Sequence, residues 1–328
     1  MRQILEVRDL RVAYGQRDGG VWHALNGVSF AVGEGEILAV LGESGSGKST
    51  LAASLLRLLP ANGRIAGGEI LLEGSDVVRM SAAELRGVRG SGMSIVFQEP
   101  SLALHPTIRI GTQICEVLRA HGVQNRRERQ ARAREILAKV FADDIVRIFS
   151  SYPHELSGGQ QQRALIAQAI ACKPVLVVAD EPTASLDAAT QREILALFQS
   201  LRDKLGIAFI FITHNPMLLA GFADRALVLY AGKVAEVGPT EAVLSAPQHP
   251  YTQALLRCLP WIDGGEVSRP RKTLLPVIEG AAPSLAVLSE GCVFEPRCDA
   301  RMEMCKIREP AAAMLGKQHE VACLKFPV

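Results

Sequence analysis

The chain has 328 residues, with 36 Lys and Arg against 34 Asp and Glu and with 48% hydrophobic residues. A net charge of +2 gives no electrostatic argument for nucleic-acid binding. No apolar run approaches the ~18 residues of a membrane-spanning helix, and the charged N-terminal segment lacks the apolar stretch of a signal peptide. We therefore expect a cytosolic protein with one large domain plus an appendage, or with two domains, in which disulfides are rare.

Short apolar runs alternate with longer helix-like segments, a pattern typical of an α/β protein with a largely parallel sheet. Buried strands are predicted where short apolar runs are bounded by glycine or polar residues, over residues 35–42, 92–99, 173–182 and 206–214. Helices are predicted over residues 49–59 and 187–205, the second with Asp187 as its N-cap.

Two regions depart from this alternation. Residues from about 100 to 165 show no convincing strand and are predicted to be mostly helical. Residues 260–290 are rich in Pro and Gly, which predicts an extended linker. A segment that contains four cysteines follows the linker.

The segment "GESGSGKST" (42–50), called the phosphate loop below, matches the pattern G-x-x-x-x-G-K-[ST] between a predicted strand and a predicted helix. Its glycines allow successive N–H groups to point at phosphates, and the following helix N-terminus adds a positive dipole end. Lys48 would reach the β- and γ-phosphates, and Ser49 would supply a hydroxyl to Mg²⁺. The candidate nucleotide-binding residues here are Gly42, Glu43, Ser44, Gly45, Ser46, Gly47, Lys48, Ser49 and Thr50.

Two adjacent acids follow the apolar run "VLVVADEP" (175–182). Asp180, at the predicted strand tip, suits coordination of Mg²⁺ directly or through a water. Glu181 would polarise the water that attacks the γ-phosphate. Together with the phosphate loop, these acids predict a nucleoside-triphosphate hydrolase.

The segment "LSGGQQQR" (156–163) then resembles the signature of the ATP-binding subunits of ABC transporters. Ser157, Gly158 and Gly159 open a helix whose N-terminus can hold an anion. The resemblance implies an α/β P-loop cassette over residues 1–258, with a RecA-like core, an antiparallel β subdomain and an α-helical signature subdomain at about 100–165. A small Cys-rich extension over residues 259–328 would follow, consisting of the linker and a four-cysteine module.

The same resemblance implies roles for individual residues. Tyr14 would stack on adenine, although an ordinary core tyrosine is the alternative. Gln98 would touch Mg²⁺ and the attacking water, and His214 would lie beside the γ-phosphate. Asn215 departs from the family, which usually has an acidic residue after this histidine. The implied catalytic residues are Glu181, His214, Gln98 and Lys48, the implied Mg²⁺ ligands are Ser49, Gln98 and Asp180, and further nucleotide contacts are Tyr14, Ser157, Gly158, Gly159, Gln160 and Asp187.

Three further segments resemble the oligopeptide, dipeptide and nickel uptake branch of the family: "FQEPSLALHP", "SYPHELSGG" and "HPYTQALL". The branch implies a peripheral subunit on the cytoplasmic side of the inner membrane that powers peptide import by hydrolysing ATP. Its implied partners are a second ATPase subunit, more often different than identical, two permease subunits and, indirectly, an extracytoplasmic solute-binding protein, with no nucleic acid. The alternatives are a nickel or other small-solute importer of this branch and a non-transport ABC ATPase of a phosphonate-degrading complex, of DNA or of ribosomes.

The four cysteines of the C-terminal segment, Cys292, Cys298, Cys305 and Cys323, have the spacing C-x5-C-x6-C-x17-C. Structural zinc sites usually place cysteines two to four residues apart, so the wider steps suit a larger cluster. Members of the branch that end in a similar cysteine pattern include some with a [4Fe–4S] cluster, and the resemblance implies one here. Zinc, with His319 as a possible substitute ligand, and free or oxidised thiols are the alternatives.

Overall fold

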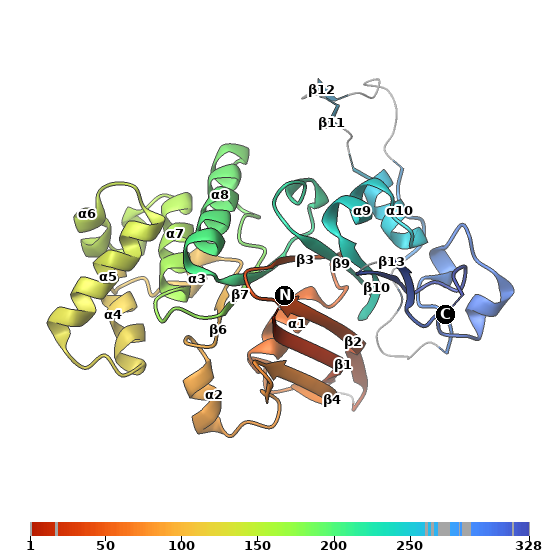
Figure 1. Ribbon diagram of the computed structural model, residues 1–328, viewed down its shortest axis with the longest axis horizontal. Coiled ribbons are helices and arrows are strands. Elements are labelled where there is room, and N and C mark those ends of the chain that lie inside the picture. The colour runs from red at the N-terminus through yellow and green to blue at the C-terminus, as the bar shows by residue number, and fades with distance from the viewer. Residues whose placement is uncertain are drawn as a thin grey trace.

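The computed structural model of the chain describes residues 2–16, 19–259, 262–263, 266–267, 276–281, 283, 290–316 and 318–327. Figure 1 shows an elongated molecule in which a helical region and the C-terminal segment lie on opposite sides of a central sheet. The predicted linker over residues 260–290 lies largely outside the described residues.

The central sheet has eight strands in the order β13-β14-β10-β9-β3-β8-β7-β6. Its parallel part consists of β3 (Ile37–Leu41), β6 (Met93–Val96), β7 (Leu176–Asp180), β8 (Ala208–Ile212) and β9 (Arg225–Tyr230). All five residues of β3 and all five of β8 are buried, because helices and a second sheet cover the two faces of a parallel sheet. The four strands predicted from apolar runs are thus confirmed as β3, β6, β7 and β8.

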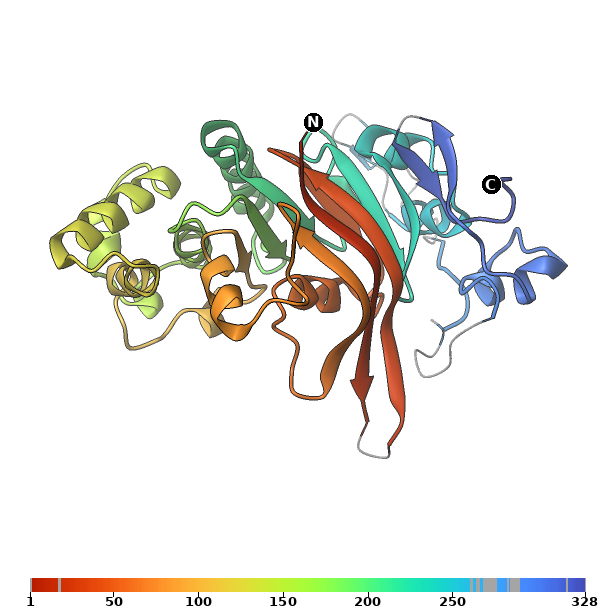
Figure 2. The ribbon, with the colours of Figure 1, turned by 60° about the horizontal axis from the view of Figure 1, so that its bottom comes forward.

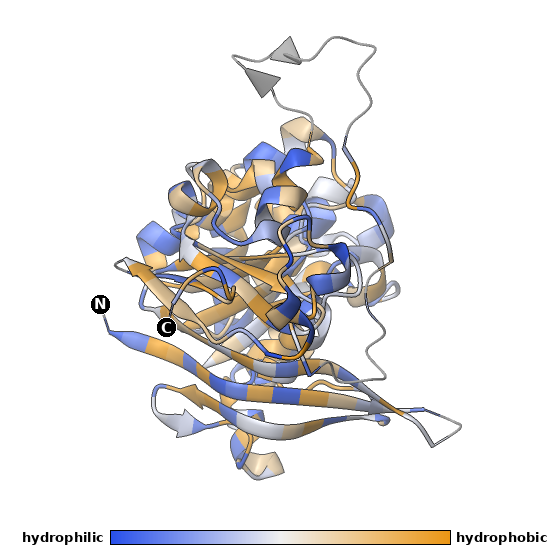
Figure 3. Cartoon of the chain, turned by 90° about the vertical axis from the view of Figure 1, so that its right-hand side faces the viewer, coloured by the Kyte–Doolittle hydropathy of each residue, from blue (hydrophilic) through white to orange (hydrophobic). Residues whose placement is uncertain are grey.

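A second, antiparallel sheet covers one face of the central sheet. It has the strand order β2-β1-β4-β5 and is formed by β1 (Gln3–Gly15), β2 (Val21–Gly33), β4 (Gly63–Leu72) and β5 (Ser75–Asp76). Along β1, hydrophobic and hydrophilic residues largely alternate (Figure 3). Its buried side chains join helix α1 (Lys48–Leu55) and one face of the central strands in a single apolar core. Figure 2 shows the long strands of this sheet beside the central sheet. This sheet is the antiparallel β subdomain that the resemblance implied.

Helices fill the region between β6 and β7, as predicted, with no strand from residue 100 to 165. These helices are α3 (Pro100–Ala103), α4 (Ile110–Ala120), α5 (Arg126–Val140), α6 (Ile145–Ser150), η1 (Pro153–Glu155) and α7 (Gly158–Ala169), whereas α2 (Ala82–Val88) precedes β6. After β7 come α8 (Ala188–Leu205), η2 (Pro216–Leu218), α9 (Thr240–Ser245) and α10 (Pro250–Arg257). Within the described parts of the chain, no helix combines the length and the apolar composition needed to cross a membrane.

The two helix predictions differ in accuracy. Asp187 caps α8 as predicted, because its Oδ1 accepts hydrogen bonds from the N–H groups of Ala189 and Thr190 at 3.0 Å. The helix predicted over residues 49–59 ends earlier, at Leu55. Arg57 then adopts a left-handed φ of 50°, which breaks the helical path before Pro60 is reached.

The C-terminal segment packs onto the cassette. Strands β13 (Ala313–Gly316) and β14 (His319–Val321) extend the central sheet beyond β10 (Lys233–Pro239). Between them and α10 lie the pair β11 (Ile262–Asp263) and β12 (Glu266–Val267) and the short helices η3 (Glu295–Arg297) and η4 (Glu303–Lys306). Phe294 is 2% exposed and belongs to the same apolar core as the central strands. The extension therefore shares its core with the cassette.

Candidate active site

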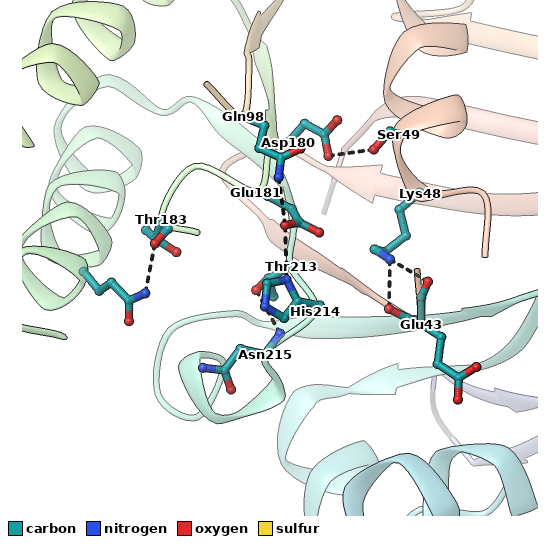
Figure 4. A network of polar contacts seen from close by, with 12 residues as sticks. Glu43, Lys48, Ser49, Gln98, Asp180, Glu181, Thr183, Thr213, His214 and Asn215 are labelled. Atoms are coloured by element: carbon teal, nitrogen blue, oxygen red, sulfur yellow. Dashed lines mark hydrogen bonds and ion pairs between the residues drawn. The ribbon is translucent and has the colours of Figure 1, made fainter. Parts of the chain in front are cut away.

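The phosphate loop connects β3 to α1, and its lysine is already oriented by the loop. The Lys48 ammonium donates hydrogen bonds of 2.8 Å to the carbonyl oxygens of both Gly42 and Glu43 (Figure 4). Burial lowers the pKa of Lys48, and the carboxylates of Glu181, Asp180 and Glu43 oppose that shift. A cation held on two carbonyls in a shielded position is prepared to exchange them for phosphate oxygens.

Two glycines of the loop stand where a side chain would not fit. Gly47 has a φ of 106°, and a Cβ there would lie 2.8 Å from the carbonyl oxygen of Ala24. Gly42 has a φ of 156°, and its Cβ would collide with the carbonyl oxygen of Leu229. The tight wrap of the loop therefore depends on glycine at both positions.

Asp180 ends β7 beside the first turn of α1. Its Oδ1 accepts a hydrogen bond of 3.4 Å from the Ser49 hydroxyl (Figure 4). Burial raises the pKa of Asp180, the hydrogen bond from Ser49 opposes the shift, and neighbouring Glu181 adds to it. A carboxylate and a hydroxyl, with the side-chain amide of Gln98 nearby, form an oxygen donor set that suits Mg²⁺.

Glu181 lies at the centre of a polar cluster formed at the carboxyl ends of three parallel strands. Its Oε2 accepts a hydrogen bond of 3.4 Å from Gln98 Nε2 and lies 3.1 Å from His214 Nδ1 (Figure 4). Glu181 has a left-handed φ of 45°, and its N–H donates to the carbonyl oxygen of Ile212 at 3.0 Å. The strained turn aims the carboxylate out of the sheet toward the other two side chains.

The departure at Asn215 leaves this turn intact. The Asn215 N–H donates to the Thr213 hydroxyl, and the Asn215 side-chain oxygen accepts from the N–H of Met217, both at 3.1 Å. An asparagine oxygen can accept this capping bond as an aspartate oxygen would. His214 accordingly remains beside Glu181.

An open pocket of about 710 Å³ joins the phosphate loop to this cluster. Gln98, Glu181 and His214 line its polar side. Tyr14 and Trp22 also line the pocket, and they lie directly opposite each other in β1 and β2. The Tyr14 hydroxyl lies 3.2 Å from the Thr50 hydroxyl. Trp22 was missed from the sequence, since only the strand register identifies it as a second aromatic at this site.

The signature residues lie elsewhere on the molecule. Ser157 caps α7, because its hydroxyl accepts from the N–H of Gln160 at 3.3 Å. A Cβ on Gly159 would lie 2.7 Å from Thr190 Cγ2, so the N-termini of α7 and α8 are closely packed. Five predicted nucleotide contacts of this region do not line the described pocket, namely Ser157, Gly158, Gly159, Gln160 and Asp187.

Four further predicted residues, three in the phosphate loop and one at the end of β7, also do not line the pocket. Gly42 and Ser46 are buried within the loop. Asp180 lies behind Ser49, to which it is hydrogen-bonded. The Glu43 carboxylate turns away from the pocket and pairs with Arg297 of the C-terminal extension at 2.9 Å. The predicted contact of Glu43 with nucleotide would therefore have to be made by its backbone, because its side chain is bound to Arg297.

The four C-terminal cysteines line one small cavity of about 20 Å³. Burial, with a smaller contribution from the other three cysteines, raises the pKa of the Cys292 thiol to about 11. Among the described residues, no group of three or more His, Cys, Asp or Glu side chains has an arrangement that could hold a metal ion. The predicted metal site is thus not supported by the donor geometry.

His319 is not part of the cysteine cavity. Its Nε2 lies 2.8 Å from Oε1 of Glu236, a residue with no exposed surface. The possible substitution of His319 for a cysteine ligand is therefore disfavoured, because its ring is already engaged by a buried carboxylate.

Comparison with known proteins finds relatives that match nearly the whole chain. Residues 25–184 match the ABC transporter family, and residues 235–305 match the oligopeptide/dipeptide transporter, C-terminal region. A Brucella melitensis protein named "Putative peptide import ATP-binding protein" is 41% identical over 98% of this chain and 97% of its own length. The dipeptide transport ATP-binding protein DppD of Bacillus subtilis is 38% identical over 98% of this chain and 95% of its own length.

Solved structures resemble the cassette part of the chain. The dimeric bacterial ABC transporter cassette MJ0796 has a TM-score of 0.63 and 28% identity, over 72% of this chain and 98% of that one. The same cassette is also known in a post-hydrolysis state bound to ADP and Pi. The fold and the site thus define an ATP-hydrolysing cassette. The chain belongs to the ATP-binding subunits of ABC transporters, in the branch that carries the oligopeptide/dipeptide C-terminal region.

Proposed function

We propose that the chain powers the import of peptides by hydrolysing ATP on the cytoplasmic side of the inner membrane, where it contacts two permease subunits. The observation that carries this proposal is the match over nearly the full chain, C-terminal region included, to subunits named for peptide and dipeptide transport. An extracytoplasmic solute-binding protein would deliver the peptide and would not contact this chain.

The site geometry supports a division of roles among its residues. Lys48 and the loop N–H groups bind the phosphates, and Tyr14 and Trp22 offer aromatic surface to adenine. Water attacks the γ-phosphorus while the bond to the β–γ bridging oxygen breaks, and Glu181 accepts the proton of the attacking water. Gln98 and His214 hold the Glu181 carboxylate in place. Ser49, Asp180 and Gln98 would hold Mg²⁺, which neutralises charge on the phosphate oxygens.

The position of the signature supports a two-subunit site. Ser157, Gly158 and Gly159 begin α7 outside the pocket, next to Asp187 at the start of α8. We infer that this surface faces the γ-phosphate bound by a second cassette. The arrangement we favour is a heterodimer, in which the second cassette is a different chain, over a homodimer. The free N–H groups at a helix start suit that anion.

Replacing the proposed base tests the ATP site. Glu181→Gln should lower ATP turnover at least about 100-fold, because proton acceptance by a positioned base contributes about 10²–10⁴-fold. ATP affinity, measured by equilibrium binding, should stay near the wild-type value. Near-normal hydrolysis in this variant would remove Glu181 from the role of base.

The cargo and the partners need a separate experiment. The full-length chain should co-purify with two permease chains, and the reconstituted complex should take up labelled di- and oligopeptides in an ATP-dependent manner. Uptake of nickel or another small solute without peptide would assign a different cargo. Isolation with nucleic acid or a metabolic enzyme complex, and without permeases, would contradict the transport proposal.

We further propose that Cys292, Cys298, Cys305 and Cys323 bind a [4Fe–4S] cluster that braces the C-terminal extension. The support is that all four cysteine residues line one cavity, and four cysteine thiolates are a donor set that such a cluster uses. Anaerobic purification should give about four iron atoms per chain, and Cys298→Ser should remove them. Cys258→Ser, outside the cavity, is the matched control and should keep them. Stoichiometric zinc without iron, or metal-free thiols, would contradict the proposal.

A further inference from the structure

The C-terminal extension contacts the phosphate loop through one ion pair. Arg297 Nη1 lies 2.9 Å from Glu43 Oε2, and Arg297 Nη2 lies 3.4 Å from Glu43 Oε1. The Arg297 side chain is only 7% exposed and that of Glu43 is 28% exposed. A forked, largely shielded pair of this kind fixes geometry far better than an exposed surface salt bridge does.

Arg297 is itself held by several groups besides Glu43. Its Nη1 donates to the Tyr230 hydroxyl at 3.2 Å, and its Nη2 donates to the carbonyl oxygen of Ile278 at 3.2 Å. Its Nε donates to the carbonyl oxygen of Glu279 at 3.1 Å. With its donors bound in several directions, the guanidinium has one defined orientation toward the loop.

Glu43 transmits this orientation to the nucleotide-binding groups. Its N–H donates to the hydroxyl of Tyr251 at 2.9 Å, and its carbonyl oxygen accepts from Lys48 Nζ at 2.8 Å. Figure 4 shows Lys48 directed at this backbone, whereas the Glu43 carboxylate points away from Ser49 and Asp180. The residue is thus held at three points, and one of them is the lysine of the ATP site.

We propose that Arg297 is a positioning residue of the ATP site, acting through Glu43 to fix the start of the phosphate loop. With Glu43 held, the carbonyl groups that support Lys48 and the loop N–H groups are arranged before ATP arrives. Binding then requires less ordering of the loop. The proposal deepens the ATPase function and rests on ATP binding at the phosphate loop.

The test uses full-length protein in its assembled complex and compares four variants. Arg297→Gln and Glu43→Gln should each raise the Kd and the KM for ATP about tenfold, which corresponds to about 1.4 kcal/mol. The double variant should bind ATP no more weakly than either single variant, because both substitutions remove the same contact. Arg297→Lys should recover part of the affinity, since an ammonium retains the charge and loses the fork.

Arg301→Gln is the matched control, because it removes the same charge from an exposed position four residues away. Its ATP affinity should equal that of the wild type. The proposal would be overturned if Arg297→Gln and Glu43→Gln both bind ATP within twofold of the wild-type affinity. A lowered melting temperature in these variants would then mean that the ion pair only stabilises the fold. Additive effects in the double variant would also overturn it.

Two further measurements separate the possible failures. If Arg297→Gln does not fold, Glu43→Gln makes the same measurement from the cassette side, and an unchanged Kd there overturns the proposal. Wild-type ATP turnover and its loss in Glu181→Gln test the site itself. If the Arg297 variants bind ATP as the wild type does, while Glu181→Gln loses turnover as expected, only the positioning role of Arg297 is refuted.

Discussion

Truncating Phe294 should release the C-terminal extension from the cassette without unfolding the cassette. The ring is 2% exposed and packs against Tyr230, Tyr251 and His249 at centroid distances of 5.1, 5.4 and 6.0 Å. Phe→Ala changes at such buried sites cost about 3–5 kcal/mol. Taking about 3 kcal/mol, the equilibrium for undocking should shift about 100-fold in Phe294→Ala.

Amide hydrogen exchange followed by mass spectrometry measures this shift locally. The N–H of Cys292 bonds to the carbonyl oxygen of Cys305 at 2.8 Å, and that of Ala322 bonds to the carbonyl oxygen of Ala235 at 2.9 Å. Both amides should exchange about 100-fold faster in the variant, while the helical subdomain should be unchanged.

Two matched variants set the scale of this prediction. Phe294→Leu keeps most of the buried volume and should accelerate exchange less than about tenfold. Met304→Ala changes a side chain of the same segment that is 40% exposed and should have little effect. Acceleration of less than threefold in Phe294→Ala would refute the view that this ring anchors the extension.

Three further outcomes are expected at the ATP site and its turns. Because burial raises the pKa of Asp180, its charge destabilises the nucleotide-free fold at neutral pH. The Asp180→Asn variant should therefore melt about 2 °C higher than the wild type at pH 7. This difference in melting temperature should shrink as the pH falls through the raised pKa of Asp180. A variant that melts below the wild type in thermal scans at pH 7 would contradict this prediction. Gly42→Ala should abolish ATP binding in equilibrium titrations, because its Cβ meets the backbone at Leu229, and retained affinity would show that the loop can shift. Asn215→Ala should lose about 1 kcal/mol in denaturant unfolding through loss of its cap, whereas Asn215→Asp should lose almost nothing; equal losses would exclude capping as the cause.

The parts of the fold predicted from sequence are those governed by local pattern. β3 and β8 are buried on both faces, so each appears in the sequence as an unbroken apolar run. The phosphate loop was predictable because glycine is required at Gly42 and Gly47 by backbone shape. Residues that follow adjacent parallel strands converge at one sheet edge, which explains the cluster of Gln98, Glu181 and His214.

The features that escaped prediction depend on contacts between distant segments. β14 is three residues long, and its place beside β10 is supported by His319 binding the buried carboxylate of Glu236. Glu43 was assigned to nucleotide by its position in the motif, but its side chain pairs with a residue 254 positions away. No local pattern encodes such a pair, because its energy depends on the tertiary arrangement that creates the shielded site.

The pair between Glu43 and Arg297 also has a consequence in the opposite direction. Coupling between two sites is reciprocal, so a contact that tightens ATP binding must be tightened by ATP to the same extent. Arg297 directly precedes Cys298 in the chain. Each round of nucleotide binding and release would thus alternately hold and loosen the segment that carries the cysteines. The accessibility of these cysteines, and of any group that they hold, would then follow the ATPase cycle, so that the C-terminal segment would report nucleotide occupancy.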